Sequence, residues 1–286
     1  MNCIIMNLNI EDYGEIDNIR DTYYNIIYDG YYHLKFIYIG GAEMKENKYD
    51  NESFFKKYSE MERSKKGLSS AGEWLELQKI LPDFHSKRVL DLGCGYGWHC
   101  KYAVDNGANF VLGIDISHKM LESAKQKNNS ERIEYLCVAM EDLDFQTDTF
   151  DVILSSLAFH YVKDFESLLK KIVLWLKKGG EFVFSVEHPV FTSYGTQDWY
   201  YDKDGNILHF PVDNYYYEGK REAIFLGEKV TKYHRTLTTY LNTLLQNGFI
   251  LQHIIEPQPP EKMINLSGMK DEMRRPMMLL VSAKKS

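Results

Sequence analysis

The sequence has few cysteines and prolines and no long apolar run, and each shortage excludes a class of protein. Its 286 residues include four cysteines and seven prolines. No two cysteines form a Cys-x-x-Cys pair, so neither a disulfide framework nor a zinc site is expected. The N-terminus lacks the pattern of a signal peptide, and no apolar run approaches the ~20 residues that cross a bilayer. We expect a cytoplasmic protein with no metal centre and no membrane contact.

Positive charge is also scarce. Lysine and arginine number 34 against 41 aspartates and glutamates, which gives a formal net charge of -7. Proteins that bind nucleic acid concentrate lysine and arginine on one face, and no such basic stripe occurs here. The composition therefore argues against a DNA or RNA partner and leaves a small molecule as the expected ligand.

Residues 1–43 differ from the rest of the chain, being crowded with tyrosine, isoleucine and asparagine. The pair Asp29-Gly30 lies between two apolar runs, which favours a hairpin over residues 22–39. A different interpretation starts from Met44, which follows two glycines whose codons can spell a ribosome-binding site. Residues 1–43 are then a translated leader. In either case we expect the functional domain to span residues 44–286.

From residue 52 onward the apolar pattern alternates between helical and strand spacing. Helical spacing occupies 52–81. Strands are predicted at 87–92, 110–114, 133–138, 150–155, 181–186, 249–256 and 276–283. Helices are predicted at 97–106, at 119–127 with Ser117 as N-cap, from Asp164 to a stop at Gly179-Gly180, and at 236–246. This alternation predicts a parallel sheet covered by helices on both faces. Residues 188–235 break it with an aromatic-rich insertion that we expect to form a substrate lid, including an Asp204-Gly205 hairpin turn.

The most informative segment is a glycine-rich turn after the first predicted strand. Glycines at 93, 95 and 97 let the backbone turn tightly and approach a ligand. In an open parallel sheet such a turn lies at the edge where ligands bind. A dinucleotide-binding turn would carry its third glycine one residue later, where Trp98 stands. The spacing therefore argues against a NAD-type oxidoreductase.

Two aspartates near this turn indicate the kind of ligand. Asp91 precedes the first glycine by two residues, where a carboxylate would repel a pyrophosphate but attract an ammonium or sulfonium group. Asp115 ends the second predicted strand, where an acidic side chain can accept both ribose hydroxyls. Together they favour a nucleoside ligand with positive charge.

With these features the chain from Met44 resembles the class I S-adenosylmethionine-dependent methyltransferases, especially the small-molecule group that includes quinone-biosynthesis-type enzymes. Residues 139–145, 150–153, 176–180 and 276–283 also match that family. The resemblance implies a Rossmann-like α/β sheet of seven strands, the last antiparallel, with the aromatic-rich insertion after the fifth strand. It implies S-adenosyl-L-methionine as cofactor. The expected cofactor-binding residues are Tyr58, Asp91, Gly93, Cys94, Gly95, Gly97, Asp115, Ile116, Met140, Glu141 and Ser156. Many relatives carry an aspartate at the position of Ala139, so Glu141 or a backbone group would contact the adenine here.

The catalytic candidates follow the fourth and fifth strands. His160 is expected beside the methyl group as a base or an orienting group, and Glu187 and His188 end the fifth strand. Pro189 keeps His188 extended, so its ring could project over the crevice. Arg235 could anchor an acidic acceptor, and the tyrosines of the insertion could form an aromatic lid.

We predict methyl transfer to a small-molecule acceptor through oxygen, nitrogen or carbon. The alternatives are another S-adenosylmethionine-using reaction and a non-catalytic S-adenosylmethionine-binding protein. The oligomeric state is not predicted.

Overall fold

The computed structural model describes residue 45 and residues 47–286. The hairpin predicted at 22–39 lies outside the described residues. So does the segment 1–43, for which an extension and a translated leader were the two interpretations.

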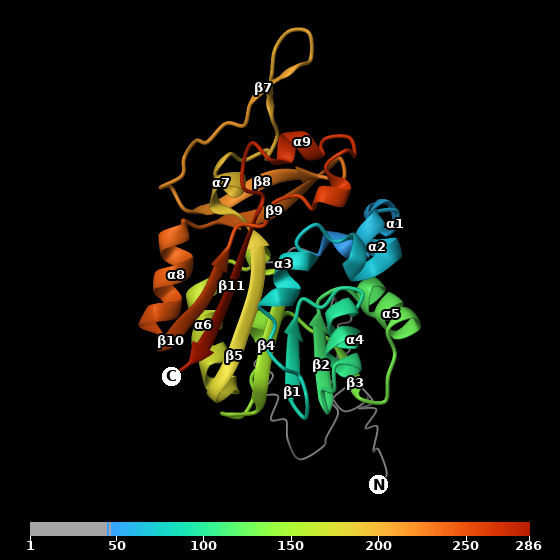
Figure 1. Ribbon diagram of the computed structural model, residues 1–286, viewed down its shortest axis with the longest axis vertical. Helices are drawn as coiled ribbons and strands as arrows, with labels where there is room; N and C mark the ends of the chain where they lie inside the picture. Colours follow the sequence, from blue (N-terminus) through green and yellow to red (C-terminus); the bar gives the residue numbers. More distant parts are fainter. Residues whose placement is uncertain (1–44, 46) are drawn as a thin grey trace, which may run out of the picture.

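One seven-stranded sheet organises the described chain (Figure 1). Its order is β10-β11-β5-β4-β1-β2-β3, in which β1 to β5 run parallel and β11 runs antiparallel to both of its neighbours. The strands are β1 (Arg88–Leu92), β2 (Phe110–Asp115), β3 (Ile133–Cys137), β4 (Phe150–Ser156), β5 (Leu176–Glu187), β10 (Phe249–Ile255) and β11 (Met278–Lys285). The predicted Rossmann-like sheet with an antiparallel last strand is confirmed.

Helices cover both faces of the sheet, because its strands are apolar on both sides. The helices α3 (Trp74–Lys79), α4 (Trp98–Asp105) and α5 (His118–Lys127) pack on one face, and α6 (Phe165–Trp175) and α8 (Leu237–Gln246) pack on the other. Successive residues of a strand enter opposite layers: Val89 joins the α3–α4 side, and Leu90 joins the α6–α8 side. Ser117 caps α5 as predicted, since its side chain accepts a hydrogen bond from the backbone of Met120.

The helix predicted to run from Asp164 was expected to end at Gly179-Gly180, and that end is wrong. Helix α6 ends at Trp175, and β5 begins at the next residue, where Leu176 pairs with Phe150 of β4. A Cβ on Gly180 would lie 2.8 Å from the side chain of Leu176 and from the carbonyl oxygen of Lys177, both in β5, and 2.9 Å from the carbonyl oxygen of Asp151 in β4. Close packing within β5 and against β4 therefore leaves no room for a side chain at this position.

The insertion after β5 begins with the short helix α7 (Pro189–Ser193) and continues as two hairpins. The first hairpin, β6 (Tyr200–Tyr201) with β7 (Ile207–His209), contains the predicted Asp204-Gly205 turn. The second, β8 (Gly219–Phe225) with β9 (Glu228–His234), was not predicted. In Figure 1 these elements lie beyond the carboxyl-terminal end of β5. The helices η6 (Glu261–Met263) and α9 (Met269–Glu272), also unpredicted, precede β11.

The described N-terminal segment forms a cover at the same end of the sheet, beside α5 (Figure 1). It consists of η2 (Lys48–Asp50), α1 (Glu52–Ser59), α2 (Glu62–Lys66) and η3 (Gly67–Ser70). No helix in the described part of the chain is long and apolar enough to cross a bilayer.

Candidate functional site

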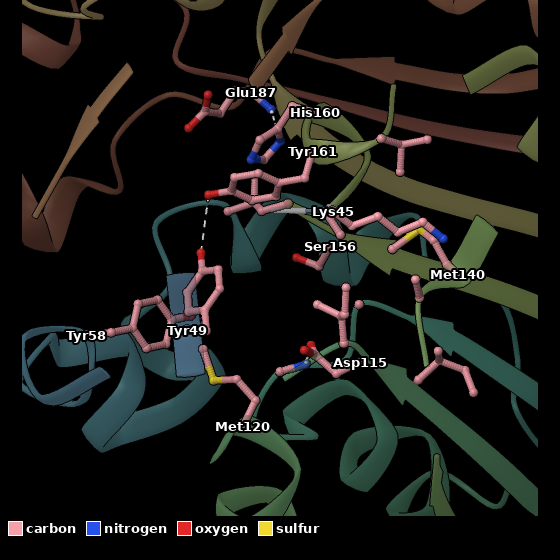
Figure 2. A pocket seen from close by; sticks show the side chains of 18 of the residues that line it. Lys45, Tyr49, Tyr58, Asp115, Met120, Met140, Ser156, His160, Tyr161 and Glu187 are labelled. Carbon is pink, nitrogen blue, oxygen red and sulfur yellow. Dashed lines mark hydrogen bonds between the residues drawn. The ribbon is translucent and has the colours of Figure 1, made fainter. Parts of the chain in front are cut away.

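A pocket opens at the carboxyl-terminal ends of the five parallel strands. Each strand contributes the residue at or just beyond its end: Gly93, Asp115, Val138, Ser156 and Glu187. Parallel strands align their carboxyl ends at one edge, which is why residues far apart in the sequence meet here. Figure 2 shows the pocket with Asp115 at one end and His160 at the other.

The glycine turn forms part of the pocket wall. Gly93 and Gly95 line the pocket, and Cys94 lines a smaller adjoining cavity together with both glycines. A Cβ on Gly95 would meet no protein atom within 4 Å, so it would project into open space that a ligand could fill. Both glycines have positive φ, +76° and +53°, a conformation that other residues rarely adopt.

Gly97 has a different role from the one expected. It lines neither cavity, and a Cβ there would come within 2.2 Å of the Tyr135 hydroxyl oxygen. Gly97 is also the N-cap residue of α4, and its φ of +71° lies in the left-handed region. Packing inside the protein, rather than contact with a ligand, therefore accounts for this glycine.

Asp115 is held rigidly at the end of β2. Its Oδ2 accepts a hydrogen bond from the backbone of Gly95 at 2.8 Å, and its Oδ1 accepts one from the backbone of Ser117 at 2.9 Å. Each carboxylate oxygen can accept a further hydrogen bond. Burial raises the pKa of Asp115 to about 6 despite these bonds. The side chain can thus accept a pair of hydroxyl groups in the pocket.

Asp91 lies behind the glycine turn and does not line either cavity. The thiol of Cys100 donates to its Oδ2 at 3.2 Å, while its Oδ1 is buried with no hydrogen-bond partner among the described residues. Burial raises the pKa of Asp91 to about 7. An unpaired buried carboxylate oxygen is costly, and a cationic donor nearby, direct or through water, would satisfy it.

The helix η4 (Met140–Asp142) forms the wall after β3. Met140 and Glu141 line the pocket, as does Ile116 from the loop after β2. Burial raises the pKa of Glu141. Ala139 also lines the pocket, so Glu141 is the acidic side chain available at this wall.

The fourth strand ends in a strained turn. Ser156 lines both cavities, and Leu157 has a φ of +54°, which is unfavourable for a branched side chain. The backbone N–H of Leu157 donates to the carbonyl oxygen of Ser185 at 2.9 Å and to the Ser185 hydroxyl oxygen at 3.1 Å, which holds the turn in place. The strain lies at the pocket wall, where such conformations concentrate in proteins.

The N-terminal cover closes the pocket with residues that the sequence did not single out, apart from Tyr58. Tyr49, Tyr58 and Arg63 all line the pocket. Arg63 also lines the adjoining cavity and lies 3.0 Å from Glu73, a buried side chain whose second oxygen has no partner among the described residues. Arg63 can reach an anionic group beside the glycine turn. In the sequence, Arg63 lies among other charged residues of α2, a pattern typical of an exposed helix. Nothing in the sequence therefore indicated that Arg63 faces the pocket.

His160 and Tyr161 lie on η5 (Phe159–Tyr161) and line the far end of the pocket. The His160 ring is buried, and its Nδ1 accepts a hydrogen bond from the backbone of Glu187 at 3.5 Å. Burial lowers the pKa of His160 to about 4, against the opposing effect of the Glu187 charge. The hydroxyl oxygens of Tyr161 and Tyr49 lie 3.2 Å apart across the pocket (Figure 2).

Glu187 lines the pocket, but both of its carboxylate oxygens are engaged. Oε1 lies 2.6 Å from the ammonium of the buried Lys232, and Oε2 accepts a hydrogen bond from Gln197 at 2.6 Å. Burial alone would raise the pKa of Glu187, but the charges of His160 and Lys232 and these hydrogen bonds hold it below its usual value.

The expected position of His188 over the crevice is wrong. His188 has an extended backbone, but its Nδ1 accepts from the backbone of Val190 at 3.0 Å, and its Nε2 lies 2.8 Å from Glu256. The ring turns away because Pro189 starts α7, and His188 becomes the N-cap of that helix. It does not line the pocket.

The insertion contributes to the pocket differently from the expected aromatic lid. Its side chain in the pocket wall is Phe225, from the unpredicted β8. Arg235 is buried and donates to the carbonyl oxygens of Phe159, Val162 and Lys163, which holds η5 in place instead of facing an acceptor. None of the tyrosines of the insertion lines the pocket; they are Tyr194, Tyr200, Tyr201, Tyr215, Tyr216, Tyr217 and Tyr233.

The strand order, the glycine turn and the acidic residue that ends β2 together define the fold and cofactor end of a class I methyltransferase. In the described residues, no group of three or more His, Cys, Asp and Glu side chains is arranged to hold a metal ion.

Comparisons with known proteins agree with this class. A family model described as a methyltransferase domain matches residues 90–184. A putative S-adenosylmethionine-dependent methyltransferase from Listeria monocytogenes is 56% identical, with a TM-score of 0.74 and coverage of 77% of this chain and 99% of that one. One from Mesorhizobium loti is 40% identical, with a TM-score of 0.71 and coverage of 77% and 100%. An uncharacterised protein from Haemophilus influenzae is 32% identical over 83% of this chain and 96% of its own length.

The chain therefore belongs to the S-adenosylmethionine-dependent methyltransferases. This membership decides against the NAD-type oxidoreductase.

Proposed function

We propose that the protein transfers a methyl group from S-adenosylmethionine to a small molecule bound beside His160. The observation that carries this proposal is a single pocket whose lining runs from Asp115 and the glycine turn to His160 and Tyr161. One cavity can thus hold a nucleoside cofactor at one end and a second molecule at the other. Its walls are partly aromatic, through Tyr49 and Phe225, which suits a small organic acceptor.

The residues present fit the cofactor. Asp115 would accept the ribose hydroxyls, and Met140 with Glu141 would face the adenine. The unpaired oxygen of Asp91 would take up the amino group through a direct or water-mediated contact, and Arg63 would bind the carboxylate. When bound, S-adenosylmethionine supplies a methyl carbon already activated by a positively charged sulfur. The protein has to align the nucleophile and exclude water. The N-terminal cover, through Tyr49 and Tyr58, would exclude the water.

Calorimetric titration tests the cofactor end. We expect S-adenosylhomocysteine to bind the wild-type protein in the micromolar range and NADH not to bind. Asp115→Ala should lose most of that affinity, because two hydrogen bonds to a charged acceptor disappear. Binding of NADH in place of S-adenosylhomocysteine, or an unchanged affinity in Asp115→Ala, would contradict the proposed use of the pocket.

Product analysis separates the remaining alternatives. Incubation with S-adenosylmethionine labelled on the methyl group and a panel of small acceptors should yield a labelled product and S-adenosylhomocysteine. A label released in another chemical form would indicate a different S-adenosylmethionine-using reaction. Tight cofactor binding without turnover of any acceptor would indicate a binding protein.

A further inference from the structure

The orientation of His160 determines what this side chain can offer to an acceptor. Its Nδ1 accepts a hydrogen bond from the backbone N–H of Glu187. An imidazole nitrogen that accepts a hydrogen bond carries no proton, so the proton of the neutral ring is on Nε2. Because burial lowers the pKa of His160 to about 4, the ring is neutral near pH 7. His160 therefore presents an Nε2–H donor rather than a basic nitrogen.

Three charged side chains act on the His160 ring. After burial, the charge of Glu187 has the largest effect on the pKa of His160 and raises it, while Lys232 and Arg235 lower it. The carboxylate of Glu187 is already occupied by Lys232 and Gln197. It is therefore not available to pair with a cationic acceptor or to remove a proton from a neutral one.

The other polar side chains at this end of the pocket are also suited to donate. The hydroxyls of Tyr49 and Tyr161 lie 3.2 Å apart and are hydrogen-bonded to each other, and a phenol hydroxyl can donate as well as accept. Burial raises the pKa of Tyr49 well above its usual value, which keeps its hydroxyl protonated. The acidic side chain of Asp115 lies at the opposite end of the pocket (Figure 2), and Glu141 lines the wall formed by η4.

We propose that the methyl acceptor is an organic oxyanion, such as a carboxylate, whose oxygen accepts a hydrogen bond from Nε2–H of His160. This inference rests on the proposed methyltransferase function and narrows its acceptor class. No side chain at this end has to remove a proton, because the nucleophile arrives already ionised.

The step balances without a base. A lone pair of the acceptor oxygen forms the new bond to the methyl carbon. The bond between that carbon and sulfur breaks, and its electron pair stays on sulfur. The negative charge of the acceptor and the positive charge of the sulfonium disappear together, giving a neutral ester or ether and S-adenosylhomocysteine. No proton or oxidant enters the reaction.

A matched set of probes tests the inference. Benzoate, benzyl alcohol and benzylamine share one ring but present an anion, a neutral hydroxyl and a cation. Each is titrated into protein saturated with S-adenosylhomocysteine. We expect benzoate to bind more tightly than the other two. His160→Leu should weaken benzoate binding about tenfold, since a hydrogen bond to a charged oxygen is lost, and His160→Gln, which keeps an N–H donor, should retain most of it.

The exposed His253 provides the control, because His253→Gln changes the same residue type outside the pocket. Thermal unfolding of each variant separates loss of binding from loss of fold. Equal or tighter binding of benzylamine or benzyl alcohol, binding of none of the three, or a folded His160→Leu with unchanged benzoate affinity would each overturn the inference. Failure of S-adenosylhomocysteine to bind in the first place would instead count against the proposed function.

Discussion

At the scale of single residues, two buried carboxylates lie beside the glycine turn. Burial raises the pKa of Asp91 to about 7 and that of Asp115 to about 6. An ionised carboxylate in such a setting is costly until a ligand donates hydrogen bonds or positive charge to it. We therefore expect these side chains to make cofactor binding sensitive to pH.

We predict that the affinity for S-adenosylhomocysteine falls as the pH is lowered from about 8 to about 5. Below its pKa each group is protonated in the free protein, and binding must expel that proton. Each group then weakens binding by up to about tenfold per pH unit. Calorimetry across this range should show a steeper fall in affinity for the wild type than for Asp91→Asn, because the variant lacks the carboxyl group with the higher of the two pKa values. Identical slopes for the two proteins would contradict a role for Asp91 in binding.

At the scale of elements, η2 links the N-terminal cover to the cofactor loop. Oδ1 of Asp50 accepts a hydrogen bond from the Ser117 hydroxyl at 2.6 Å and one from the backbone of Lys119 at 3.1 Å. Asn47 also donates to Oδ2 of Asp50 at 2.9 Å. The cover thus binds the first turn of α5, directly after Asp115.

Asp50→Ala should loosen this cover. We expect the free energy of unfolding to fall by about 1–2 kcal/mol, because two capping hydrogen bonds are lost. S-adenosylhomocysteine should also dissociate several-fold faster, because Tyr49 and Tyr58 move with η2 and α1. Urea unfolding and stopped-flow dissociation measure the two effects. The exposed Asp105→Ala is the control; an unchanged dissociation rate in Asp50→Ala would show that the cover does not retain the cofactor.

At the scale of the whole molecule, a buried ion pair joins the insertion to the sheet. Lys232 of β9, which is 2% exposed, lies 2.6 Å from Glu187 at the end of β5. When one member of a buried ion pair is removed, the other member is left as a buried charge without a partner.

Lys232→Met should therefore destabilise the protein by about 3–5 kcal/mol, the usual effect of breaking a buried pair. Adding Glu187→Gln should recover most of that loss, since no buried charge then remains. Lys229→Met, on the same strand but with a side chain 75% exposed, should change the free energy of unfolding by less than about 1 kcal/mol. Urea denaturation of the four proteins checks this. A double variant no more stable than Lys232→Met would show that the loss comes from packing rather than charge.

The sequence predicted the sheet because its signals are local. The alternation of apolar runs identified the strands of the sheet, and a side chain such as Ser117 caps its own helix. The errors come instead from packing inside the folded protein. Gly180 resembles a helix stop, yet it lies inside β5, where Leu176, Lys177 and Asp151 leave no room for a Cβ, and Gly97 resembles a ligand-binding glycine, yet it makes room for Tyr135. Asp151 and Tyr135 are distant in the sequence from these glycines, so no local pattern records those contacts.

By itself the sequence determined the fold class, the position of the glycine turn and the presence of an acid after the second strand, since these follow from backbone geometry over a few residues. Only the tertiary structure decided which side chains face the pocket. It turned His188 toward Glu256 and Arg235 toward backbone carbonyls, and it brought Tyr49 and Phe225 into the pocket wall. The direction of a side chain depends on what packs around it, and here that packing comes from the cover and the insertion, whose placement is settled only when the whole chain folds.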